Sequence, residues 1–280
     1  MSLAAIAFPN IDPVALRIGP IAVHWYGLAY LSGFVGAVLL LRWLAERWGL
    51  GLTDDDLLTI LLGAILGVIV GGRLGYVLFY GAGYYLARPA EILAIWDGGM
   101  SFHGGLVGIL VAGIVVARSL RMPWLTLCDL GAVGAPIGFL LGRIANFINA
   151  ELWGRVSDVP WAVVFPGAGP LARHPSQLYE AALEGVVLFV VLLVLALKLP
   201  PRPRGELLGW MLAGYGLFRV VAEFFRQPDA QIGFLPAGTT MGQLLSLPML
   251  LGGLGLVLWA RRAALPQLGP SRDSAATRAK

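Results

Sequence analysis

Ionisable and amide side chains interrupt stretches of this chain that are otherwise strongly apolar. Inside a membrane segment such a residue costs roughly 2.5–3.5 kcal/mol or more at the centre, so it needs a partner or a function. The set comprises Arg73, His103, Arg143, Asn146, Asn149, Glu151, Glu180, Glu184, Arg219 and Glu223. Arginine matches phosphate with a planar fork of donors, and histidine moves protons near neutral pH. These residue types therefore predict a site for a phosphate-bearing group at which a proton is transferred.

The spacing of Arg219 and Glu223 places them on one helix face, and Tyr215 extends that face. Two interpretations stay open. The residues either contribute to a site, or form an intrahelical ion pair that only allows both to enter the membrane.

Glu180 and Glu184 share a helix face and carry like charge. Each of them is expected either to face an arginine or to be protonated. Arg143 and Asn146 are three residues apart and are also neighbours on a helix. Arg73 either extends its charged end to the membrane surface or pairs with one of these carboxylates.

The composition defines the elements that must position these residues. The chain has 280 residues, of which 58% are hydrophobic and only 13% charged, and its mean hydropathy is +0.79. A soluble domain has about 25% charged residues, and a disordered chain lacks this much apolar surface. The single Cys128 excludes a disulfide scaffold, and the net charge of +4 comes without the dense basic patch of a nucleic-acid-binding protein. We therefore expect an all-α integral membrane protein.

Seven apolar segments are long enough to span a bilayer as helices, at about 20 residues each. Their approximate ranges are 24–42, 57–80, 102–120, 127–149, 178–199, 207–225 and 241–260. Two of them carry glycines at every fourth residue, a pattern typical of close helix packing in membranes. These ladders are Gly63, Gly67, Gly71 and Gly75, and Gly134, Gly138 and Gly142.

The loops between these segments differ in basic charge. Loops on the side of the N-terminus hold five arginines, whereas the other side holds twelve Lys and Arg residues. The positive-inside rule then predicts that the N-terminus is outside and the C-terminus is cytoplasmic. With this orientation the polar residues of five or six segments reach one level near the outer leaflet. We expect a polar cavity there.

The chain is expected to form one transmembrane catalytic domain over residues 1–260, followed by a basic, disordered cytoplasmic tail over 261–280. The first 23 residues lack a basic n-region and contain three prolines, so they do not form a convincing signal peptide.

Several stretches resemble the phosphatidylglycerol–prolipoprotein diacylglyceryl transferase family. The most specific is GRIANFINAELWG over residues 142–154. Three others are SFHGG (101–105), RHPSQLYE (173–180) and GYGLFRVVAEFFR (214–226), and Tyr26 with Gly27 fits the start. The resemblance runs from about His24 to Trp259 in the same order as in the family.

The resemblance implies a transferase of the bacterial cytoplasmic membrane with its active site on the outer, periplasmic side. Such an enzyme moves the diacylglyceryl group of phosphatidylglycerol to the thiol of the lipobox cysteine in a preprolipoprotein signal peptide, releases glycerol 1-phosphate, and needs no metal or cofactor. Phosphatidylglycerol, the signal peptide and membrane lipids are the implied partners.

The implied catalytic residues are His103, Arg219, Glu223 and Tyr26. The implied phosphatidylglycerol-binding residues are Arg143, Asn146, Glu151, Gly154 and Tyr215. His103 would take the thiol proton, but Arg219 could instead lower the pKa of the thiol. The roles of Arg73, Glu180 and Glu184 stay open.

Three other classes of protein fit the sequence less well. A transporter would place its site near the midplane and is often built from repeats. A metal-dependent phosphatidyltransferase would need an aspartate-rich motif, which the sequence lacks. A structural scaffold would not need a polar layer at the outer leaflet.

Overall fold

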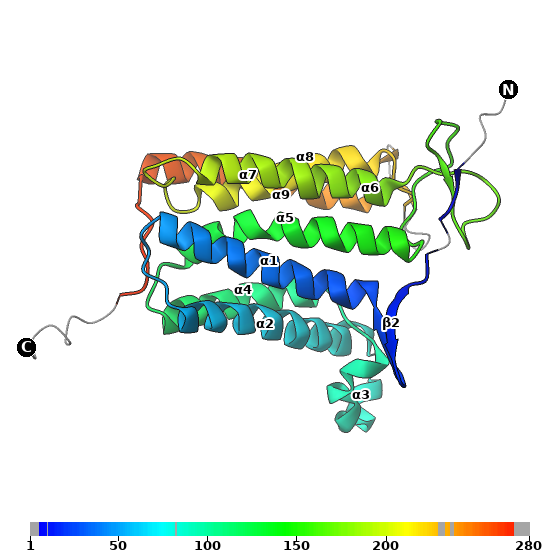
Figure 1. Ribbon diagram of the computed structural model, residues 1–280, viewed down its shortest axis with the longest axis horizontal. Coiled ribbons are helices and arrows are strands. Elements are labelled where there is room, and N and C mark those ends of the chain that lie inside the picture. Colours follow the sequence, from blue (N-terminus) through cyan, green and yellow to red (C-terminus); the bar gives the residue numbers. More distant parts are fainter. Residues whose placement is uncertain (1–5, 10, 82, 229–232, 236–237, 272–280) are drawn as a thin grey trace, which may run out of the picture. The chain divides into compact units, whose positions relative to one another are not determined.

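The computed structural model describes residues 6–9, 11–81, 83–228, 233–235 and 238–271, and most of them are helical (Figure 1). The helices are α1 (Trp25–Arg47), α2 (Asp54–Tyr80), α3 (Tyr84–Ala87), α4 (Phe102–Ser119), α5 (Trp124–Ile148), α6 (Ser176–Glu180), α7 (Leu188–Ala196), α8 (Glu206–Glu223) and α9 (Met241–Ala263). A π-helical stretch, η3 (Ala181–Val187), joins α6 and α7 into one continuous helix. Two short 3-10 helices, η1 (Pro89–Leu93) and η2 (Ile95–Asp97), lie between α3 and α4.

The described part of the chain also contains four short strands, which the all-α prediction did not include. The strands β2 (Val14–Ile18) and β3 (Ile21–His24) form an antiparallel hairpin directly before α1. The two-residue strands β1 (Ile6–Ala7) and β4 (Val163–Val164) pair in parallel. Both sheets lie outside the long helices.

Five helices in the described part of the chain are long and apolar enough to cross a membrane: Trp25–Arg47, Asp54–Phe79, Trp124–Ile148, Ser176–Ala196 and Met241–Ala263. The apolar helix α4 is shorter, and α8 carries three charged residues among its 18. The prediction of a multi-pass helical membrane protein is thereby confirmed. The total of seven spans and the direction of the termini stay predictions.

The chain divides into two compact units. Unit 1 comprises residues 1–44 and 129–266, and unit 2 comprises residues 45–128 and 267–280. Helix α9 continues through Arg261 and Arg262, and residues 272–280 of the predicted tail lie outside the described part.

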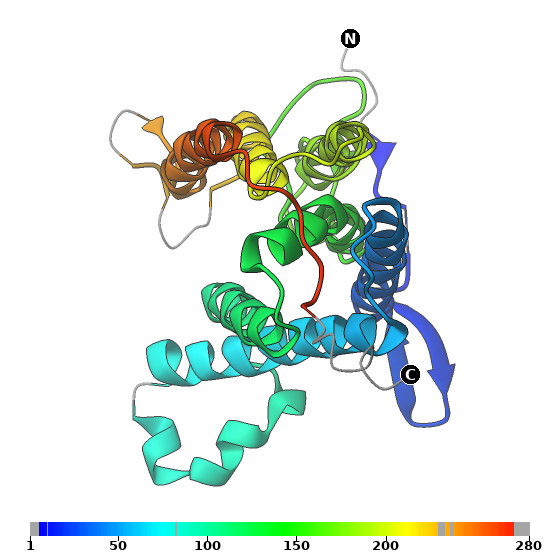
Figure 2. The ribbon, with the colours of Figure 1, turned by 90° about the vertical axis from the view of Figure 1, so that its left-hand side faces the viewer.

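Unit 1 is built from long helices that run alongside one another. Seen nearly end-on in Figure 2, α8 (yellow) lies between α7 and α9. Glycines allow the close approach of α8 to α9, because a Cβ at Gly209 would lie 2.8 Å from the carbonyl oxygen of Gly253. Helix η3 approaches α5 at Gly185, where a Cβ would lie 2.7 Å from the Cβ of Leu140.

The predicted glycine ladders pack as expected, with one exception. In unit 2, Gly67, Gly71 and Gly75 of α2 contact the glycines of α4, and Gly63 contacts Val116. In unit 1, a Cβ at Gly134 would lie 3.0 Å from the Cβ of Ala37, and one at Gly33 would lie 3.3 Å from the Cα of Gly138. A Cβ at Gly142 would meet no atom of the described residues within 4 Å, so the close helix contact predicted there is not observed.

The start of α8 is fixed by a carboxylate from another helix. Asp129 of α5 is fully buried and accepts hydrogen bonds from the backbone N–H of Gly205 at 2.7 Å and of Leu208 at 2.8 Å. A carboxylate at a helix N-terminus satisfies donors that the helix itself leaves free. Asp129 therefore ties the α5 start to the α8 start.

Candidate active site

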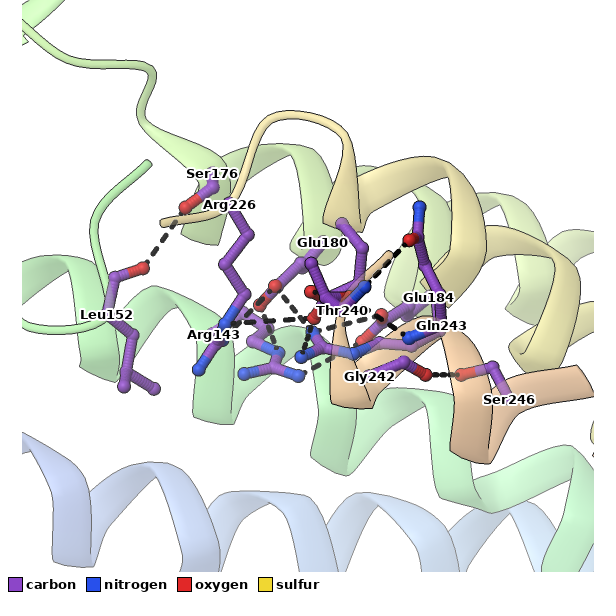
Figure 3. Close-up of polar contacts among 12 residues, drawn as sticks. Arg143, Leu152, Ser176, Glu180, Glu184, Arg226, Thr240, Gly242, Gln243 and Ser246 are labelled. Atoms are coloured by element: carbon purple, nitrogen blue, oxygen red, sulfur yellow. Dashed lines mark hydrogen bonds and ion pairs between the residues drawn. The ribbon is translucent and has the colours of Figure 1, made fainter. Parts of the chain in front are cut away.

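Three arginines and three glutamates of unit 1 gather at one end of its helices, and we call them the Arg–Glu cluster (Figure 3). Its members are Arg143 of α5, Glu180 of α6, Glu184 of η3, Arg219 and Glu223 of α8, and Arg226 just after α8. The end of α5, the start of α6 and the end of α8 meet here because consecutive long helices run in opposite directions. Within unit 1, polar residues from several helices thus lie at one level, as predicted.

Glu180 lies at the centre of the cluster and is fully buried. Its Oε1 accepts hydrogen bonds from Nη1 of Arg219 at 2.6 Å and from Nη1 of Arg226 at 3.3 Å. Its Oε2 forms an ion pair with Nε of Arg143 at 2.8 Å. One carboxylate thus orients three guanidinium groups.

The other two glutamates complete the pairing. Glu184 is also fully buried, and its Oε2 lies 3.3 Å from Nη2 of Arg143. Oε1 of Glu223 lies 2.5 Å from Nη2 of Arg219, and its Oε2 accepts a hydrogen bond from the Thr240 hydroxyl at 2.7 Å. The predicted Arg219–Glu223 contact is confirmed, as is the expectation that Glu180 and Glu184 face arginines.

A π-helical turn carries part of the cluster. The stretch η3 begins directly after Glu180 and contains Glu184. Such turns within α-helices occur frequently at functional sites.

The cluster is balanced in formal charge and leaves N–H donors unused. Among the described residues, the contacts of Arg143 use Nε and Nη2, and those of Arg219 use Nη1 and Nη2. Within the described part of the chain, the N–H groups on Nη1 of Arg143 and on Nε of Arg219 therefore have no acceptor. These side chains are 18% and 14% exposed, whereas those of Glu180 and Glu184 are fully buried.

This arrangement is suited to holding an anion. Guanidinium groups already fixed by carboxylates do not have to reorganise when an oxyanion arrives, and donors fixed in advance stabilise developing negative charge. Burial also strengthens such interactions relative to water. The cluster is therefore a candidate site for a phosphate group.

A second polar group lies next to the cluster along α5. The side-chain amide of Asn146 donates to Oε1 of Glu151 at 2.7 Å and to the hydroxyl of Tyr26 at 3.5 Å. Asn146 is buried and follows Arg143 by three residues. The structure thus brings together three of the predicted site residues, which come from α1, α5 and the turn after α5.

Tyr215 and Gly154 lie in the same unit but differ in role. Tyr215 packs against Phe139 with ring centroids 5.1 Å apart. Its hydroxyl group interacts electrostatically with the guanidinium groups of Arg143 and Arg219. Gly154 is buried between backbone segments, and a Cβ there would lie 2.6 Å from the carbonyl oxygens of His174 and Phe225. The observed role of Gly154 is thus to allow this close approach.

His103 and Arg73 belong to unit 2 and are not among the residues that the Arg–Glu cluster brings together. His103 is exposed in the first turn of α4, just after Ser101, whose Oγ accepts a hydrogen bond from the N–H of Gly104. Arg73 is buried, and its guanidinium donates to the backbone carbonyls of residues 91, 92, 98 and 99 at 2.6–3.2 Å. Arg73 therefore fixes the segment between α3 and α4.

His174 lies in the loop before α6, outside the long helices. Partial burial, and then the charge of Arg155, lower its pKa, while Asp158 opposes them. Its Nδ1 lies 3.1 Å from the hydroxyl of Tyr179, and its ring meets that of Phe225 edge-on. At neutral pH His174 is thus an uncharged packing residue.

Four residues of the site were not singled out from the sequence: Arg226, Thr240, Ser176 and Gln177. Arg226 lies one residue beyond the predicted segment 207–225. Its spacing of three residues from Glu223 would have placed it on the same face of a continued helix. Its N–H does bond the carbonyl of Ala222, which continues the last turn of α8. Thr240 carries no such signal, because it begins another helix.

The fold and the cluster define an integral membrane protein with a charged site inside a helix bundle. The chain belongs to the prolipoprotein diacylglyceryl transferase family, whose family model matches residues 13–259, and it is a transferase. Curated relatives named phosphatidylglycerol–prolipoprotein diacylglyceryl transferase include proteins of Geobacter sulfurreducens and Rhodospirillum rubrum. The first is 52% identical over 92% of this chain and 99% of its own length. The second is 54% identical over 93% and 96%, respectively.

Proposed function

We propose that this protein transfers the diacylglyceryl group of phosphatidylglycerol to the thiol of a lipobox cysteine in a preprolipoprotein and releases glycerol 1-phosphate. The relatives' names supply the reaction class. The observation that carries the proposal is the Arg–Glu cluster, whose partly exposed arginines keep N–H donors that no described residue accepts.

The reaction requires stabilisation of a phosphate leaving group. The cysteine sulfur forms a bond to the terminal glycerol carbon of the diacylglyceryl group, and the bond from that carbon to the phosphate oxygen breaks. The electron pair of that bond leaves with the phosphate, and the thiol proton must be removed. Cationic donors at the phosphate and an acceptor for this proton are therefore the two requirements.

Arg143 and Arg219 would meet the first requirement. Nη1 of Arg143 and Nε of Arg219 would donate to the phosphate oxygens, while Glu180, Glu184 and Glu223 hold the two guanidinium groups in place. Removing one preorganised donor of this kind typically lowers kcat about 10²–10³-fold.

Asn146, Glu151 and Tyr26 would orient the glycerol head group. Their carboxylate, amide and hydroxyl groups lie next to the arginines along α5 and suit the hydroxyls of such a head group. Tyr215 would add a hydroxyl from α8. Gly154 would contribute through backbone packing and not through direct contact.

His103 would accept the thiol proton, because a thiolate is the reactive form and a free thiol is only slightly ionised at pH 7. The alternative is that Arg219 lowers the pKa of the thiol. Near-normal turnover of the His103→Gln variant would remove His103 from the role of base.

We place the protein in the bacterial cytoplasmic membrane, with the Arg–Glu cluster toward the outer side. The opposite end of unit 1 carries five basic residues, namely Lys198, Arg202, Arg204, Arg261 and Arg262, which favours that end as the cytoplasmic one. A C-terminal reporter that works only in the cytoplasm should therefore be active, and an inactive reporter would contradict this orientation.

The proposed function is tested with purified protein, phosphatidylglycerol and a synthetic lipobox peptide. We expect the peptide to gain the mass of one diacylglyceryl group, and phosphorus NMR should show glycerol 1-phosphate in equal amount. A peptide with serine in place of its cysteine is the control. No mass gain with any lipobox peptide, when a relative from the same family is active in parallel, would refute the proposal.

A further inference from the structure

The turn that carries Glu151 has an unusual backbone. Its neighbours Ala150 and Leu152 adopt φ angles of 54° and 57°. These are left-handed conformations that residues with a side chain rarely adopt, and a bulky residue such as leucine is an outlier there. Strain of this kind persists only where surrounding contacts hold the backbone, and it occurs preferentially at functional sites.

Two residues at the start of α6 hold this turn. The side-chain amide of Gln177 donates to the carbonyl of Glu151 at 2.5 Å. The hydroxyl of Ser176 donates to the carbonyl of Leu152 at 3.1 Å, a bond that Figure 3 shows. Both side chains are fully buried. The two bonds fix consecutive carbonyls on either side of the Leu152 nitrogen.

The held turn aims the Glu151 carboxylate at Asn146, which donates to it at 2.7 Å. Gln177 and Glu180 are three residues apart at the start of the same helix, so they share one face of it. The same helix face therefore holds the Glu151 turn and orients the arginines of the Arg–Glu cluster.

We propose that Ser176 and Gln177 are positioning residues for phosphatidylglycerol, acting through Glu151 by holding its turn in the left-handed conformation. This inference rests on the proposed function of the site. Neither residue needs to touch the lipid. Their hydrogen bonds set the distance between the head-group residues Asn146 and Glu151 and the phosphate-binding arginines.

The first test is the Ser176→Ala variant in the transfer assay. We expect KM for phosphatidylglycerol to rise about three- to tenfold, the effect of one lost hydrogen bond, while KM for the peptide stays within twofold. Gln177→Asn, whose shortened amide cannot reach Glu151, should behave in the same way. Ser246→Ala is the matched control, because Ser246 is also buried and donates to a backbone carbonyl at 2.6 Å, but within α9.

The second test is rescue by Leu152→Gly. Glycine adopts positive φ without strain, so the turn should keep its shape without the serine bond. KM of the Ser176→Ala, Leu152→Gly double variant should return to within about threefold of wild type. A loss of packing alone would not be reversed by a second truncation. Equal KM values for Ser176→Ala and the Ser246→Ala control, or no rescue, would overturn the inference.

Hydrogen exchange separates this inference from the proposed function. The N–H groups of Ala150 and Glu151 bond the carbonyls of Phe147 and Asn146, and their exchange should be at least tenfold faster in Ser176→Ala. Unchanged exchange would overturn the positioning role even if the enzyme is active. A wild-type protein that transfers no lipid would instead refute the proposed function, while the exchange result would still decide whether Ser176 holds the turn.

Discussion

Glu180 orients three arginines at once, so replacing Glu180 with glutamine tests the cluster severely. In the wild type Oε1 accepts hydrogen bonds from Arg219 and Arg226, and Oε2 forms an ion pair with Arg143. In the Glu180→Gln variant one of these positions becomes an NH2 group, which points its hydrogens at a guanidinium. The cluster also keeps three arginines against two carboxylates.

The magnitude follows from the burial of Glu180. Breaking a buried ion pair by removing one partner costs about 3–5 kcal/mol, because it leaves an uncompensated buried charge. The free energy of unfolding should fall by that amount. Misorienting one donor to a leaving group costs about 10²–10³-fold in kcat, so we expect kcat for lipid transfer to fall at least about 10²-fold.

Glu206→Gln is the matched control for this prediction. Glu206 is 1% exposed and pairs with Arg261 at 2.9 Å, at the opposite end of the same unit. This variant should lose a similar amount of stability but keep kcat within about threefold of wild type. Unfolding in detergent micelles and peptide mass gain, both measured below the unfolding transition, give the two quantities.

Two results would refute the role of Glu180. One is a Glu180→Gln variant with near wild-type kcat, which would show that the orientation of the arginines is not required. The other is an equal loss of kcat in both variants, which would show that activity follows stability alone.

Three further variants test the packing around the site. Gly154→Ala should be unstable and inactive, because its Cβ would meet two backbone carbonyl oxygens at 2.6 Å; a normal thermal midpoint would contradict this. Gly108→Ala should separate α2 from α4, because the added Cβ would clash with the carbonyl oxygen of Gly67. Its thermal midpoint should be lower than that of the control Gly252→Ala, whose added Cβ would have no atom within 4 Å. Arg73→Lys should lose most of the hydrogen bonds to backbone carbonyls, and the free energy of unfolding should fall by at least about 2 kcal/mol. Proteolysis between residues 84 and 99 should become faster, and unchanged proteolysis would contradict the role of Arg73 in fixing this segment.

The sequence was sufficient to predict the long helices and part of the cluster. Each of the seven predicted segments overlaps a helix, because long apolar runs leave few alternatives in a membrane. The Arg219–Glu223 contact followed from helical spacing alone. The high free energy of burying like charges together predicted that Glu180 and Glu184 either face arginines or are protonated, and the structure shows each of them facing an arginine.

Other features depended on tertiary packing and could not be predicted. Thr240 reaches Glu223 only because α9 begins beside the end of α8. Ser176 and Gln177 lie in a recognised motif, but their bonds depend on a left-handed turn that no local pattern indicated. Gly154 was predicted as a lipid-binding residue, but local spacing gave no sign that backbone segments pack too closely around it for a side chain.

The central claim, that Arg143 and Arg219 hold the phosphate of phosphatidylglycerol, is tested most directly by lipid binding. Affinities for phosphatidylglycerol and for diacylglycerol with the same acyl chains are compared in detergent micelles, for wild type and for Arg143→Gln. We expect Arg143→Gln to bind phosphatidylglycerol about tenfold more weakly or worse, with affinity for diacylglycerol unchanged within twofold. An equal change for both lipids, or no change for either, would contradict it.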